Sequence, residues 1–131
     1  MFEGYGEYFF AEQEKTYFGN FEKGQMEGQG KEVWTDGQQY IGNYHNNMKH
    51  GQGTLIAEGK VYVGSWEKNM KHGIGYESKI EGQTRRKGEW KKGNWFRWLG
   101  QTETVSGSIK TSGNFIQTLD NLQEKLVVET N

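Results

Sequence analysis

The chain has 131 residues, a length that favours one structural unit over a repeat array joined to a separate catalytic domain. Aromatic residues make up 15% of the sequence within a hydrophobic share of only 32%, which excludes a disordered chain and a deep aliphatic core. Its 16 basic and 17 acidic residues nearly cancel, although residues 1–32 are acidic and residues 85–97 are basic. Without cysteine, signal peptide or long apolar run, we expect a soluble, cytoplasmic protein that is neither secreted nor membrane-spanning.

A period of 22 to 24 residues runs through most of the chain. Its opening segments are Tyr17-Phe18-Gly19-Asn20-Phe21, Tyr40-Ile41-Gly42-Asn43-Tyr44, Tyr62-Val63-Gly64-Ser65-Trp66 and the degenerate Arg86-Lys87-Gly88-Glu89-Trp90. Eleven residues after each Tyr comes a Gly-x-Gly pair, at Gly28/Gly30, Gly51/Gly53 and Gly73/Gly75, and the chain starts with a further pair, Gly4/Gly6. We therefore divide residues 1–99 into a half-repeat 1–16, repeats 17–39, 40–61 and 62–85, and a degenerate capping repeat 86–99.

Two kinds of short turn connect the expected strands. One precedes each Tyr segment, at Asp36-Gly37, Glu58-Gly59 and Glu81-Gly82, and is typical of two-residue hairpins. The other lies at equivalent positions that hold only Gly or Asn, the residues that most easily adopt positive φ: Gly24, Asn47, Asn69 and Gly93. The sequence thus predicts a mostly β fold, a single-layer antiparallel meander of hairpins. Glu14 replaces the expected glycine in the first copy, so its turn geometry stays open.

Alternation along each opening segment places two rings and a glycine on one strand face. The bare glycine leaves room for a ring to lie across the backbone. Any single ring could belong to the packing core, but a single-layer sheet cannot bury a whole face against itself, so we expect the aromatic face as a whole to be exposed and to bind a partner. The rings concerned are Tyr17, Phe21, Tyr40, Tyr44, Tyr62, Trp66 and Trp90.

The pattern Y-x-G-x-[FYW] followed by G-x-G resembles the MORN (membrane occupation and recognition nexus) repeat family over roughly residues 2–99. Lys49-His50-Gly51 and Lys71-His72-Gly73 are also similar to sequences common in that family. The resemblance implies a non-enzymatic scaffold or assembly subunit. It also suggests a cytoskeletal or ciliary setting, since radial spoke head and protist cytoskeletal proteins have a similar layout.

The pattern changes after the array. Residues 95–99 lack the expected glycines and are predicted to form a capping strand, and the Ser/Thr/Gly-rich residues 100–113 a flexible connector. A spacing of 4, 3 and 4 then predicts an amphipathic helix over 114–129 with Phe115, Leu119, Leu122 and Leu126 on its apolar side. We expect this helix to bind a partner, with docking on the protein's own aromatic face as the alternative.

The sequence offers little for catalysis or ligand binding. It has no phosphate-binding G-x-x-x-x-G-K and no nucleophile motif, so we predict no enzyme, cofactor or small-molecule substrate. His45, His50 and His72 are assigned structural roles rather than a metal site, because the latter two occupy equivalent repeat positions beside a turn.

A basic, ring-containing segment at the end of the array supports a different function. Its cations are Arg85, Arg86, Lys87, Lys91, Lys92 and Arg97, and Trp90, Trp95, Phe96 and Trp98 lie between them. Such a cluster could bind acidic lipid headgroups and make the protein a peripheral membrane adaptor. The structural alternative is an edge strand guarded by charge. Nucleic acid is disfavoured because the basic residues are confined to one end.

Overall fold

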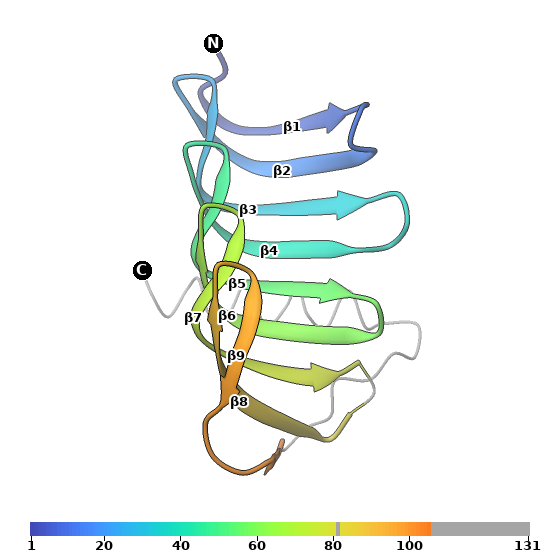
Figure 1. The fold of residues 1–131 in the computed structure, drawn as a ribbon. Coiled ribbons are helices and arrows are strands. Elements are labelled where there is room, and N and C mark those ends of the chain that lie inside the picture. Colours follow the sequence, from blue (N-terminus) through green and yellow to red (C-terminus); the bar gives the residue numbers. More distant parts are fainter. Residues whose placement is uncertain (81, 106–131) are drawn as a thin grey trace.

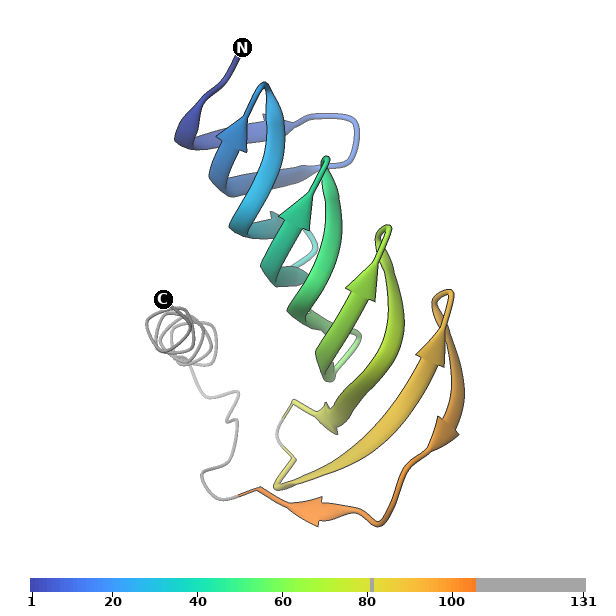
Figure 2. The ribbon, with the colours of Figure 1, turned by 90° about the vertical axis from the view of Figure 1, so that its left-hand side faces the viewer.

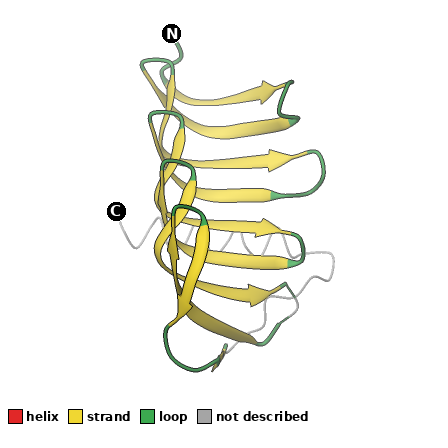
Figure 3. Ribbon diagram, viewed as in Figure 1, coloured by secondary structure: helices red, strands yellow, loops and turns green. Residues whose placement is uncertain are grey.

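The computed structural model describes residues 1–80 and 82–105, and within them every regular element is a strand (Figures 1 and 3). The strands are β1 Gly4–Phe10, β2 Lys15–Glu22, β3 Gln25–Trp34, β4 Gln39–His45, β5 Met48–Ala57, β6 Lys60–Glu67, β7 Met70–Lys79, β8 Thr84–Lys91, β9 Asn94–Trp98 and β10 Glu103–Thr104. Consecutive strands pair antiparallel from β1 to β8 in one sheet. The predicted single-layer meander is confirmed, whereas the predicted helix 114–129 lies outside the described residues.

The last repeat ends the sheet with two short strands. Both pair with β8, β9 along Gly88 to Lys91 and β10 along Thr84 and Arg85. The strand predicted over 95–99 is therefore present as β9. Strand β10 falls within the segment predicted as a connector, and residues 106–113 of that segment lie outside the described part of the chain.

Left-handed residues close the turns as the sequence predicts. Gly24, Asn47, Asn69 and Gly93 have φ of 77°, 69°, 70° and 88°. Glu14 also adopts positive φ, 52°, so the first repeat makes its turn without the glycine. The amides at these turns tie successive hairpins together, since Asn47 N–H donates to Met26 O at 3.1 Å and Asn69 N–H to Lys49 O at 3.1 Å. Figure 2 shows these turns following one another along one side of the array.

The core is a column of rings over glycines. Each tyrosine covers the glycine two residues further along its own strand and the paired glycine of the next strand: a Cβ added at Gly30 would lie 2.5 Å from Tyr17 Cε2. Neighbouring rings meet edge to face, for example Tyr17 and Tyr44 with centroids 5.1 Å apart and Tyr62 and Trp90 with centroids 4.9 Å apart. The glycines are thus the spaces that the rings fill.

The expectation of an exposed aromatic face was wrong. All seven predicted rings are buried, with 0 to 7% of their surface exposed. The reason is a register shift that follows the glycine in the opening segments, between Gly42 and Tyr44 in β4 and between Gly64 and Trp66 in β6. Such bulges bend a strand, and Figure 2 shows the curvature of the sheet. One curved layer therefore buries its own aromatic face.

Candidate interaction surfaces

The hydroxyls of the ring column are satisfied within the chain. Tyr17, Tyr40 and Tyr62 each donate to the carbonyl three residues further on, at 2.7 to 2.8 Å. Tyr44 donates instead to Glu32 Oε1 at 2.8 Å. Burial raises the pKa of all four phenols, that of Tyr62 to about 12. These rings offer no free polar group to a partner.

A buried charge network closes the same face near the first repeats. Glu32 is 1% exposed, and its Oε2 lies 2.5 Å from Lys15 Nζ. The Lys15 ammonium also lies over the rings of Phe10 and Trp34, 5.4 and 5.3 Å from their centroids. Paired in this way, the two charges can be buried without the large cost of an isolated ion.

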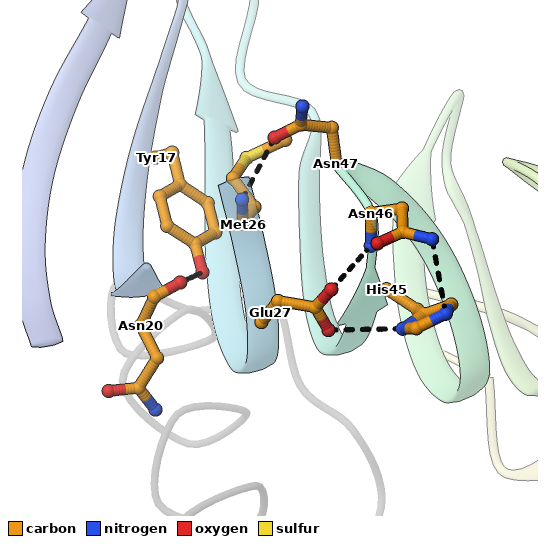
Figure 4. A network of polar contacts seen from close by, with 7 residues as sticks. All are labelled: Tyr17, Asn20, Met26, Glu27, His45, Asn46 and Asn47. Carbon is orange, nitrogen blue, oxygen red and sulfur yellow. Dashed lines mark hydrogen bonds and ion pairs between the residues drawn. The ribbon is translucent and has the colours of Figure 1, made fainter. Parts of the chain in front are cut away.

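A second network of polar contacts lies at the turns and includes His45 (Figure 4). Glu27 accepts the Asn46 N–H at 2.9 Å and lies 3.1 Å from His45 Nδ1. The backbone bond from Asn46, followed by the contact with His45, lowers the pKa of Glu27. In the same figure, Asn47 Oδ1 accepts the Met26 N–H at 2.8 Å.

His72 occupies the repeat position of Glu27 and has the same role. Its Nδ1 accepts the Lys92 N–H at 3.1 Å, so the side chain at this position caps the next turn. Within residues 1–80 and 82–105, no three His, Asp or Glu side chains are grouped as a metal site would require. His72 thus caps the β8–β9 turn.

The basic cluster does not form one open patch. Arg85 Nε binds Glu103 at 3.0 Å and Arg97 Nε binds Glu89 at 2.8 Å. Arg86 lies over Trp98 and Lys91 over Phe96, 4.9 and 3.8 Å from the ring centroids. Arg85, Arg86 and Lys87 lie at one end of β8, and Lys91 and Lys92 at the other. Four of the six predicted lipid contacts thus have partners in the chain.

The first strand carries exposed rings that the sequence analysis overlooked. Tyr5, Tyr8 and Phe9 of β1 are 76%, 41% and 56% exposed, and Phe2 just before the strand is 57% exposed. Among the described residues, β1 pairs only with β2, along its whole length. A groove of about 420 Å³ beside it is lined by Phe2, Tyr8, Phe10, Phe21 and Met26 with neighbouring polar side chains. The signal was available in the sequence, because Tyr5, Tyr8 and Phe9 lie at repeat positions that hold no ring in the later copies.

Comparison with known proteins agrees with this architecture. The MORN repeat profile matches residues 17–39, 40–58 and 62–83 in succession. The chain belongs to the MORN repeat family. A search of curated proteins gave no match.

MORN repeats form a non-enzymatic module that engages proteins or membrane lipids. Among the described residues of this MORN chain, no helix is long and apolar enough to cross a membrane. Of the predicted partner contacts, the seven rings form the core, whereas Phe115, Leu119, Leu122 and Leu126 lie outside the described residues.

Proposed function

We propose that this MORN protein is a non-catalytic scaffold that binds a protein partner at the edge of β1. One observation carries the proposal: β1 combines a backbone edge that no other described strand pairs with and three exposed aromatic rings, with a fourth, Phe2, just before it. Unpaired backbone groups along an edge are a template for another strand, and added strands are a common mode of peptide recognition. The resemblance stated above favours a larger cytoplasmic assembly, cytoskeletal or ciliary, as its setting.

The opposite end of the array is built differently. There β9 and β10 cover the two halves of β8, and both are short. Both strands carry charged side chains, such as Arg97 in β9 and Glu103 in β10. Short, charged edge strands are a device against further pairing. The seven-residue β1, by contrast, has Glu7 as its one charged residue.

The chemistry of this edge defines the partner. Alternation places Tyr5, Glu7 and Phe9 on one face of β1. Tyr8 faces the other way and contacts Phe2, with ring centroids 5.8 Å apart. An extended segment with apolar side chains on both faces and a Lys or Arg opposite Glu7 would complement this strand. Residues 1–32, with seven Glu and three Lys, add a negative potential that attracts such a segment.

A peripheral membrane role is the second candidate. It is favoured by Trp95 and Phe96, which are 52% and 49% exposed beside basic side chains, as at a membrane interface. Contacts within the chain count against the membrane role. Lipid headgroups would have to displace the present partners of four cations: Arg85, Arg86, Lys91 and Arg97. We therefore rank protein binding first.

Two charge-altering variants separate the candidates. Tyr5→Asp with Phe9→Asp adds charge to exposed positions of β1, and we expect it to reduce capture of the native partner at least tenfold. The matched control, Arg85→Glu with Arg86→Glu and Lys87→Glu, should leave capture unchanged. Weak or no flotation with phosphoinositide liposomes at physiological salt is expected of the parent protein. Strong flotation that only the basic-end variant abolishes, with capture insensitive to the β1 variant, would favour the membrane role.

A further inference from the structure

The face of the sheet opposite the rings carries a second buried cluster. Ile41, Ile56 and Val61 are 6%, 5% and 1% exposed and pack together. The register places Gln39 opposite Ile56 and Thr54 opposite Ile41, so these two belong to the same face. Gln39 and Thr54 are also buried, at 2% and 7%. We call Gln39, Ile41, Thr54, Ile56 and Val61 the outer patch.

Burial this complete needs a covering layer. The ten described strands all belong to one sheet, and Ile80 is the partly buried apolar neighbour that they supply to the cluster. Val63 shows what an uncovered position of this face is like. It lies on β6, two residues after Val61 and on the same face, yet it is 41% exposed. The cover therefore lies over Val61 and its neighbours and ends before Val63.

An unsatisfied polar atom gives independent support. Gln39 is 2% exposed, and its Oε1 has no hydrogen-bond partner among the described residues. A buried amide oxygen left without a donor costs about 1 to 3 kcal/mol. The cover should therefore present polar hydrogen as well as apolar surface.

We infer that residues 114–129 of this chain dock on the outer patch through Phe115, Leu119, Leu122 and Leu126. The chain leaves the described part at the end of the sheet where the patch lies, because β10 pairs with Thr84 and Arg85 at the start of β8, and Val105 N–H donates to Gln83 O at 2.7 Å. Strand β10 is three strands from β6, about 14 Å away. Residues 106–113 can span up to about 27 Å, which is ample reach.

The chemistry of the segment fits the surface. The apolar spacing at 115, 119, 122 and 126 makes one stripe, and an isolated helix of this length is marginal in water unless the stripe is buried. At helical spacing Gln123 flanks the stripe, and its side-chain amide can supply the donor for Gln39. The stripe that the sequence assigns to a partner is thus engaged within the chain.

Paramagnetic labelling of the full chain tests the docking. The sequence has no cysteine, so Val63→Cys provides a single site for a spin label at the border of the patch. We expect the label to broaden the Leu119 and Leu122 methyl signals of the same molecule. A label at Lys92→Cys should leave them sharp, because Lys92 follows the end of β8 whereas Gln39 and Val61 lie near the starts of β4 and β6.

A mixture of spin-labelled chains with isotope-labelled chains identifies the source of the cover. Sharp methyl signals in the mixture are expected, because docking occurs within one molecule. Broadening in the mixture would assign the patch to a second copy and overturn the inference. Sharp signals in both samples would also overturn it, leaving the stripe to a separate partner.

Melting of full-length variants gives a second readout. Leu119→Asp with Leu122→Asp should lower the melting temperature by several degrees. Gln117→Asp with Asn121→Asp adds the same charge on the side of the expected helix away from the stripe and should change the melting temperature much less. Equal melting temperatures for the parent and the leucine variant would contradict docking.

Discussion

The substitution Gly42→Ala probes the contact between rings and glycines at the centre of the sheet. A Cβ at this position would lie 2.6 Å from Gln52 O and 2.8 Å from the Tyr40 hydroxyl, and it would also meet the Gly53 backbone. Backbone atoms of a paired strand cannot rotate away as a flexible side chain can. The methyl group must therefore push β4 and β5 apart or displace the Tyr40 ring.

The expected cost follows from two opposing effects. Overpacking of this kind costs about 1 to 3 kcal/mol, and rigid backbone neighbours favour the upper end of that range. Loss of unfolded-state entropy on replacing Gly by Ala offsets about 0.4 to 1 kcal/mol. The net destabilisation is then roughly 2 kcal/mol, or about 8 to 16 °C in melting temperature for a domain of this size. Gly42→Val should cost more.

Gly6→Ala is the matched control for this experiment. Gly6 also belongs to a Gly-x-Gly pair, but a Cβ there meets only the Phe21 ring at 3.5 Å, an ordinary contact. The melting temperature of the Gly6→Ala variant should equal or slightly exceed that of the parent protein. Thermal unfolding followed by circular dichroism compares the two variants. If Gly42→Ala melts within a degree of Gly6→Ala, the proposed packing of rings over glycines is incorrect.

Three further outcomes follow from the described contacts. Tyr44→Phe removes the hydroxyl that donates to Oε1 of the buried Glu32 carboxylate and should cost about 1.5 to 3 kcal/mol in urea unfolding, more than Tyr40→Phe, whose hydroxyl binds a backbone carbonyl. Asn69→Ala should have a lower melting temperature than Asn69→Gly. Both variants lose the acceptor of the Lys49 N–H, but only alanine is strained at a φ of 70°. Tyrosine ionises near pH 10 when unfolded, and burial raises the pKa of Tyr62 to about 12. The folded state therefore keeps protons that the unfolded chain releases, and stability should fall as the pH rises from 10 to 12; a flat urea midpoint over this range would contradict the assignment.

Much of the array could be predicted from the sequence because the repeat specifies it locally. The Gly or Asn at each turn dictates a left-handed residue, and the pairing of Gly42 with Gly53 follows from the common register of the motifs. The burial of the rings could not be predicted in this way. It depends on the bulge between Gly42 and Tyr44, which bends the strand and is not evident from residue alternation.

The candidate site was harder to predict than the fold. Sequence reasoning selected the rings with the strongest pattern, such as Tyr40 and Tyr62, but a strong pattern across repeats marks positions that pack against one another. Tyr5 and Phe9 lie at repeat positions that hold no ring in the later copies and were therefore passed over, although they are among the more exposed rings. The pairing of Arg97 with Glu89 is likewise a contact between strands that residue composition does not show.

Amide hydrogen exchange of the chain alone and in complex with its captured partner tests the central claim most directly. A partner strand added to β1 should protect backbone amides within residues 4–10 and leave those of β8 and β9 unchanged. Protection confined to residues 84–98, with β1 exchanging as in the free protein, would contradict binding at this edge.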